Sequence, residues 1–167
     1  AYTLADGTFN TDFGVPYELT EGYHPEDVHG DNYYVYVTYR NSAFIIAVAR
    51  FTVANGEIKV EPGSGPVGTE VRISGEGLRQ GQKITIEYDG DDIDIASGDE
   101  GTDSEGKFTC TIIIPESIEG NHTVTATDES GNKPETEFSV KSKITIAPTI
   151  AAVGNTIEVS GTGFGRR

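Results

Sequence analysis

The residues best suited to chemistry are acidic side chains between positions 87 and 105. This segment holds nine Asp and Glu and no Lys or Arg, so it carries −9 of the net charge of −15. Hard cations such as Ca²⁺ take about six to eight oxygen ligands. We expect calcium, if it is bound, to use four carboxylates, with a solvated acidic hairpin as the alternative: Asp89, Asp91, Asp92 and Asp94.

These acids follow the spacing of an EF-hand loop only in part. If Asp89 is the first position, Asp91 is the third and Glu100 the twelfth. The fifth position is Ile93, which has no side-chain oxygen, and Asp94 stands sixth, where the loop needs Gly. Repulsion among nine acids still favours a counter-ion. Calcium is therefore the one cofactor that the sequence suggests.

A second group of metal-ligand types lies at positions 23–31, where His24 and His29 accompany three acids. Two His four apart on a helix would share a face, but these are five apart, and Pro25 and Gly30 indicate a loop. The sequence favours a solvated loop over a metal site.

Residues 121–123 (Asn-His-Thr) form an N-glycosylation sequon at the expected start of a strand. Asn121 is the candidate acceptor if the chain is secreted, although such triplets also arise by chance.

Residues 33–40 (YYVYVTYR) alternate as a β-strand with apolar side chains on both faces. Tyr33, Val35 and Val37 share one face with Tyr39, and Tyr34 and Tyr36 occupy the other. We expect a core strand whose outer face packs on a neighbouring domain or subunit. An aromatic platform for glycan is the alternative.

Motifs for nucleophilic catalysis are absent from the sequence: there is no Gly-x-Ser-x-Gly elbow and no phosphate-binding loop. Cys110 alternates with Phe108 and Ile112, which predicts a buried thiol without reactivity. We expect no enzymatic activity.

The amino-acid composition indicates an all-β protein. Val, Ile and Thr number 13, 16 and 19, whereas Leu numbers 3 and Met and Trp are absent. β-Branched side chains suit a pleated sheet better than a helix. The net charge of −15 disfavours nucleic acid and anionic membranes as partners. No apolar stretch approaches the ~18 residues of a membrane span, so we expect no membrane insertion.

The chain contains an internal repeat. Residues 58–78 (IKVEPGSGPVGTEVRISGEGL) align without gaps on residues 144–164 (ITIAPTIAAVGNTIEVSGTGF), with seven identities in twenty-one positions and an offset of 86. Gly68 and Gly154 are equivalent, and we expect both to adopt positive φ.

A looser match involves the N-terminal segment. Residues 6–9 and Pro16 correspond to residues 105–108 and Pro115 at an offset of 99, and residues 51–53 correspond to 138–140 at an offset of 87. The difference of 12 predicts an insertion after Pro16. We therefore expect the C-terminal half of an immunoglobulin-like domain with a loop insertion in 1–55, a complete domain in 56–141, and the N-terminal strands of a further domain in 142–167.

The complete unit shows seven short strand patterns, at 57–61, 69–75, 82–88, 92–97, 107–114, 121–127 and 135–141. This spacing predicts an all-β fold of tandem immunoglobulin-like antiparallel β-sandwiches.

Five stretches, at 62–78, 84–90, 103–108, 114–115 and 121–128, resemble the IPT/TIG-type immunoglobulin-like repeats of bacterial and archaeal cell-surface proteins. The resemblance covers nearly all of 57–140 and recurs in 143–164. It implies a lattice or stalk module of an extracellular protein, such as an S-layer protein or adhesin, without catalytic residues.

The expected partners are neighbouring copies of the same protein or adjacent immunoglobulin-like domains, at the cell surface or outside the cell. A half sandwich would expose a hydrophobic edge, so we expect either a longer array or strand donation between subunits to complete each end. Two alternatives remain: an adhesin module that recognises glycan or a partner protein, and an accessory domain of a large hydrolase.

Overall fold

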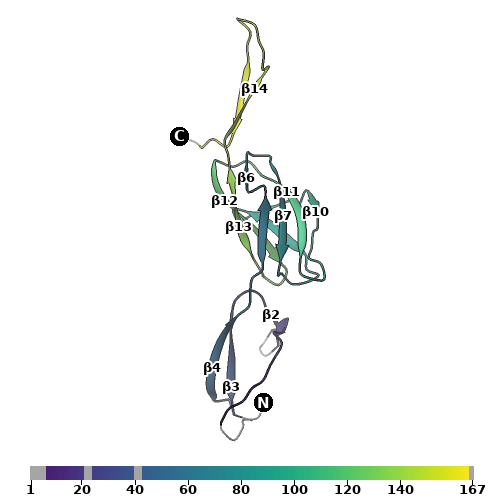
Figure 1. Ribbon diagram of the computed structural model, residues 1–167, viewed down its shortest axis with the longest axis vertical. Coiled ribbons are helices and arrows are strands. Elements are labelled where there is room, and N and C mark those ends of the chain that lie inside the picture. The colour runs from purple at the N-terminus through teal and green to yellow at the C-terminus, as the bar shows by residue number, and fades with distance from the viewer. Residues whose placement is uncertain (1–6, 21–23, 40–42, 166–167) are drawn as a thin grey trace.

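The computed structural model describes residues 7–20, 24–39 and 43–165. This part of the chain is built from strands and contains no α-helix. The all-β prediction is confirmed. The chain is elongated, with an N-terminal hairpin at one end, a two-sheet body in the middle and a projecting C-terminal hairpin at the other end (Figure 1). Within the described residues, no helix has the length and hydrophobicity needed to cross a membrane.

The central body has two sheets. One contains, in spatial order, β10 (Ser97–Gly98), β11 (Phe108–Ile113), β7 (Glu70–Glu76) and β5 (Glu57–Glu61). The other contains β6 (Ser64–Gly65), β13 (Glu135–Val140), β12 (Gly120–Asp128), β8 (Ile84–Tyr88) and β9 (Asp91–Ile93). Adjacent strands are antiparallel except β6 and β13, which are parallel.

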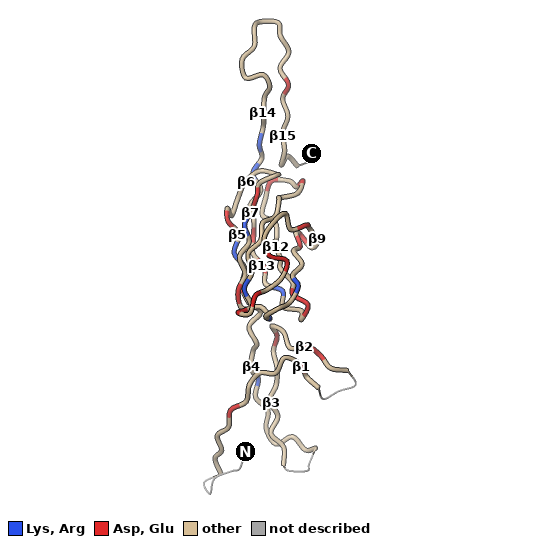
Figure 2. Tube along the Cα trace, turned by 90° about the vertical axis from the view of Figure 1, so that its right-hand side faces the viewer, with Lys and Arg blue, Asp and Glu red and all other residues tan. Residues whose placement is uncertain are grey.

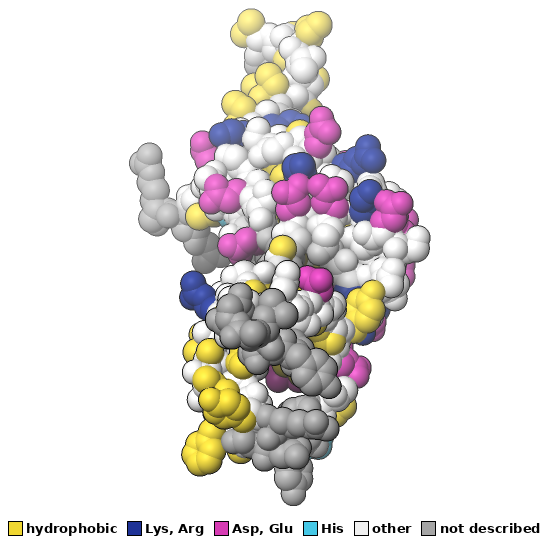
Figure 3. Space-filling model, turned by 60° about the horizontal axis from the view of Figure 1, so that its bottom comes forward, with side chains coloured by type: hydrophobic (Ala, Val, Ile, Leu, Met, Phe, Trp, Pro, Cys, Tyr) yellow, Lys and Arg dark blue, Asp and Glu magenta, His cyan; other side chains and the backbone are white. Residues whose placement is uncertain are grey.

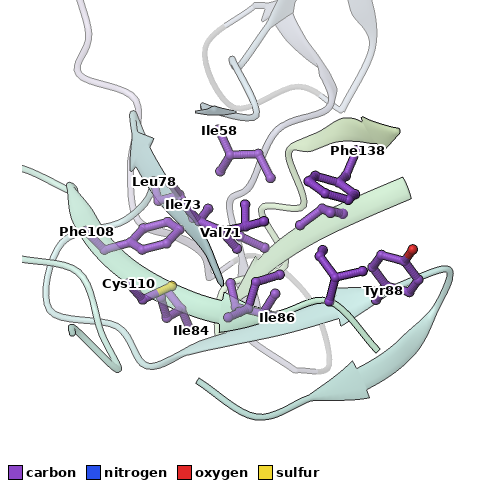
Figure 4. Packing of buried hydrophobic residues seen from close by; sticks show 14 of the residues in the cluster. Ile58, Val71, Ile73, Leu78, Ile84, Ile86, Tyr88, Phe108, Cys110 and Phe138 are labelled. Atoms are coloured by element: carbon purple, nitrogen blue, oxygen red, sulfur yellow. The ribbon is translucent and has the colours of Figure 1, made fainter. Parts of the chain in front are cut away.

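The core lies between these sheets because their strands alternate between buried and exposed side chains. Val71 and Ile73 of β7 and Phe138 of β13 are fully buried, and they meet side chains of β8 and β11 (Figure 4). Cys110 is also buried, as its alternation predicts, and burial with the nearby Asp99 raises the pKa of its thiol to about 11.

The sequence prediction was wrong for one strand. Residues 92–97 do not form a continuous strand, because the chain crosses there from the five-stranded sheet to the four-stranded one. Ile93 and Ile95 both pack against the core. The Ala96 N–H then donates to the Thr111 carbonyl at 2.8 Å, which starts the pairing of β10 with β11.

Two segments flank the body. The N-terminal one contains β1 (Glu18–Leu19), β2 (Glu26–Asp27), β3 (Asn32–Thr38) and β4 (Ile45–Thr52), in which β1 pairs with β2 and β3 with β4. The C-terminal one is a hairpin of β14 (Lys143–Ala147) and β15 (Glu158–Thr162).

The C-terminal hairpin repeats the register of β5 and β7. Ile58 lies opposite Gly75, and Ile144 lies opposite Gly161. Both partners of the second pair are therefore 86 positions after those of the first pair. Gly68 (φ 81°) and its equivalent Gly154 (φ 92°) both have the predicted positive φ. The sequence repeat is therefore matched by a repeat of the strand pairing.

Candidate functional site

The turn between β8 and β9 directs the first predicted calcium ligand toward the sheet. Asp89 and Gly90 both have positive φ (53° and 89°), as a tight two-residue hairpin turn requires. The Asp89 carboxylate accepts the Thr123 N–H at 2.9 Å and lies 2.6 Å from Nδ1 of His122. Partial burial acts to raise the Asp89 pKa, but these hydrogen bonds outweigh it and the pKa is lowered.

His122 connects this turn to the body. Its ring stacks on Tyr88 at 5.1 Å, and its Nε2 lies 2.8 Å from the Ile118 carbonyl oxygen. Both ring nitrogens face acceptors, which only the protonated imidazole can satisfy together. Burial acts to lower the His122 pKa, but the contacts with Asp89 and Ile118 outweigh it and raise the pKa above its usual value.

The remaining predicted calcium ligands lie elsewhere. Asp91 lies opposite Tyr88 on β9. Asp92 and Asp94 line an open hollow of about 620 Å³ together with Glu100. In the described ranges, no three His, Cys, Asp or Glu side chains are placed to hold one metal ion. His24 and His29 are among the described residues and belong to no such group. Calcium binding stays a prediction.

The sequon asparagine is exposed on β12. The Asn121 side-chain amide donates to a Glu137 carboxylate oxygen at 3.0 Å across the β12–β13 pair. Its modification also stays a prediction.

The Tyr-rich strand is β3, and its two faces differ in exposure. Tyr33 and Val35 are half-buried, whereas Tyr34 and Tyr36 on the opposite face are each 54% exposed. The rings of Tyr34 and Tyr36 lie 6.4 Å apart, which makes a small aromatic surface open to solvent.

A buried carboxylate that the sequence analysis did not single out organises the junction between the N-terminal segment and the body. Asp128 is 3% exposed, and its oxygens accept the N–H groups of Arg79, Ser130 and Asn132 at 2.9–3.0 Å. They also accept the side-chain amide of Asn132 at 2.8 Å. Four donors on one carboxylate hold the β12–β13 connection in a single conformation.

This organised connection contacts the inserted segment directly. The Asn132 side-chain oxygen accepts the Gly30 N–H at 2.8 Å. The Arg79 guanidinium forms a salt bridge with Asp27 and lies over the Tyr17 ring, 5.0 Å from its centroid. Polar and cation–π contacts therefore fix the inserted segment against one end of the body.

The sequence did contain a signal for this junction. The predicted strands at 121–127 and 135–141 leave residues 128–134 as their connection, and an Asp at the start of a turn commonly accepts backbone N–H groups. The contacts of Asn132 with Gly30 could not be found this way, because the two residues are separated by 102 positions.

The comparisons with known proteins assign no family: no family model matches the chain, and no similar curated protein or solved structure was found.

Proposed function

We propose that this chain is a structural repeat module of an extracellular prokaryotic surface protein, which builds an S-layer lattice, stalk or filament. In this proposal the three parts, 1–55, 56–141 and 142–167, belong to successive immunoglobulin-like sandwiches. The observation that carries the proposal is the repeated register, in which β14–β15 has the same pairing as β5–β7 at a distance of 86 residues.

The contacts at the junction favour a role as a stiff spacer between neighbouring units. Repeat modules contact mainly their neighbours in the array, so their function depends on fixed contacts between successive units. The Asp128 carboxylate, Arg79 and Asn132 provide such contacts between the body and the N-terminal segment. We propose a structural role and no enzymatic activity, because these polar groups are engaged with one another.

Electron microscopy of the native assembly, with an antibody against the body, tests this function. We expect label at regular intervals along a filament or across a lattice. Label on dispersed particles without periodic order would contradict the proposal.

A ligand-binding adhesin is the second candidate, and the outer face of β3 favours it. Tyr34 and Tyr36 expose two neighbouring rings, and stacking on sugar rings is a common use of exposed aromatic side chains. A glycan-array screen compares the chain with a Tyr34→Ala, Tyr36→Ala double variant, and Phe44→Ala, which removes another exposed ring, is the control. Binding that only the Tyr variant loses would support the adhesin; no binding by the unmodified chain would contradict it.

A further inference from the structure

The outward face of the β3–β4 hairpin differs in chemistry from the surface of the body. Charged residues gather on the body, whereas β3 and β4 carry a single charged side chain, Arg50 (Figure 2). Figure 3 shows hydrophobic side chains gathered at the N-terminal end, which comes forward in that view, and on the hairpin at the opposite end. Apolar surface of this kind commonly marks a place of interaction.

Alternation along the two strands places four exposed side chains on this outward face, which we call the tyrosine platform: Tyr34, Tyr36, Val48 and Arg50. Across the hairpin, Tyr34 lies opposite Arg50 and Tyr36 lies opposite Val48. The neighbouring Phe51 points to the other face, where its ring lies 5.8 Å from that of Tyr33. The platform is therefore separate from the packed side of the hairpin.

The body contains the counterpart of this hairpin in β12 and β13. β4 leads into β5 as β13 leads into β14, and residues 51–53 match residues 138–140 at an offset of 87. Phe138 points into the core of the body, as its equivalent Phe51 points to the packed side of the first hairpin. The outward residues of the two hairpins can therefore be compared position by position.

The outward face of the body's hairpin is polar and acidic instead of aromatic. Thr123 and Glu137 lie opposite each other at the positions of Tyr34 and Arg50, and Glu135 occupies the position of the platform valine. These three residues of the body are exposed, so no other strand of a complete unit covers this face. The aromatic and basic side chains of the platform therefore have no packing role inside the unit.

Arg50 has no carboxylate partner among the described residues. The salt bridges there use other cations: Lys59, Arg79, Lys107, His122 and Lys133. A guanidinium can bind a carboxylate with two parallel hydrogen bonds. One arginine supplies one such contact, and a chain with a net charge of −15 repels a polyanion. The ligand that fits this charge pattern carries a single carboxylate.

The two tyrosine rings suit the apolar face of a sugar. Their centroids lie 6.4 Å apart and their planes are inclined by 32°, so they form one continuous surface. Each ring presents an apolar body to a stacked ligand and a hydroxyl group to solvent. Hot spots for protein partners are usually held in well-packed pockets, whereas these two side chains are each 54% exposed. The open surface favours a saccharide over a protein.

We propose that the tyrosine platform binds a saccharide that contains one carboxylated sugar, such as a sialic or uronic acid. Arg50 holds the carboxylate, and Tyr34 and Tyr36 stack on the sugar rings. This inference rests on the glycan-binding candidate described above, and it adds the chemical class of the ligand and the residue that selects it.

Paired saccharides on an array test the ligand class. Each trisaccharide with one sialic or uronic acid is printed beside its methyl ester, which keeps the rings and removes the charge. We expect the acids to bind at least ~10-fold more tightly than the esters, because the esters cannot form the ion pair. Arg50→Gln should reduce binding of the acids to the level of the esters. Arg50→Lys, which keeps the charge without the paired donors, should restore only part of it.

Arg72→Gln is the matched control. Arg72 is an exposed arginine on the outward face of β7 in the body, so its replacement changes the net charge by the same amount. It should alter binding of the acids less than ~2-fold, because salt screens a distant exposed charge. Neither glutamine variant should change the Tm of the body, since both arginines are exposed.

The outcomes separate the ligand class from glycan binding itself. Equal binding of acids and esters, or equal losses in Arg50→Gln and Arg72→Gln, would overturn the inference and leave the adhesin candidate standing. No binding to any saccharide would overturn both. Binding of a Glu-rich peptide in place of the saccharides would identify a protein partner and also overturn the inference. The periodic label expected in the native assembly does not depend on any of these results.

Discussion

Ile58 and Ile144 occupy equivalent positions of the repeat, but their surroundings differ. Ile58 is 5% exposed in the core of the body, and Ile144 is 65% exposed on the C-terminal hairpin of β14 and β15. Replacing each by Ala removes the same three carbons. The two substitutions therefore measure how much of the repeat is packed in a single copy.

The expected costs follow from burial. Three buried carbons at about 0.8 kcal/mol each give roughly 2.4 kcal/mol, and the cavity left behind brings the cost of Ile58→Ala to about 3 kcal/mol. Ile144 has only about a third of its surface covered and leaves no closed cavity, so Ile144→Ala should cost below about 1 kcal/mol.

Urea unfolding followed by circular dichroism measures both values, at a protein concentration low enough for copies to stay apart. Equal losses of unfolding free energy at low concentration would refute the reasoning, because the hairpin would then be packed within the single copy.

Three further predictions concern the junction, the acidic turn and calcium. Asp128→Asn should lower the free energy of unfolding by about 3 kcal/mol in urea titrations, because its new NH₂ group faces N–H donors. The control Glu129→Gln, at the exposed neighbouring position, should change this free energy by less than about 0.5 kcal/mol. Similar small losses for both variants would contradict the hydrogen-bond network around Asp128. His122 has a raised pKa, so its stabilising contact is complete below about pH 6.5 and is lost as pH rises through the folded-state pKa. Asp89 has a lowered pKa, so its contribution is present above about pH 3.8 and is lost as pH falls through the folded-state pKa. Melting curves between about pH 5 and 9 should fall more steeply for the unmodified chain than for His122→Gln, and parallel curves would exclude this role of the pair. Calcium should raise the Tm of the body and chelator should lower it, an effect that Asp92→Asn should reduce; an unchanged Tm would rule out calcium binding.

The alternation of short strands was sufficient to predict most of the body. The strand at 57–61 was placed correctly, and Cys110 was correctly expected in the core, because apolar side chains recur at every second position there. The crossing between sheets at 94–96 could not be predicted in this way, since Ile93 and Ile95 give the same alternation whether or not the strand changes sheets.

The sites were harder to predict than the strands. Four acids close in sequence suggested one calcium site, but the two-residue turn directs Asp89 toward His122 while Asp92 and Asp94 face a different hollow. The junction depends on contacts such as Gly30 with Asn132, which are distant in sequence. Local patterns carry little information about such pairings.

Amide hydrogen exchange tests most directly whether the closed core of the repeat is confined to the body. We predict that residues 157–162 exchange quickly, although they occupy the same positions of the repeat as the buried strand at 71–76. Residues 70–76 of the body should be protected, which provides an internal reference. Protection of residues 157–162 equal to that of residues 70–76 would contradict the account.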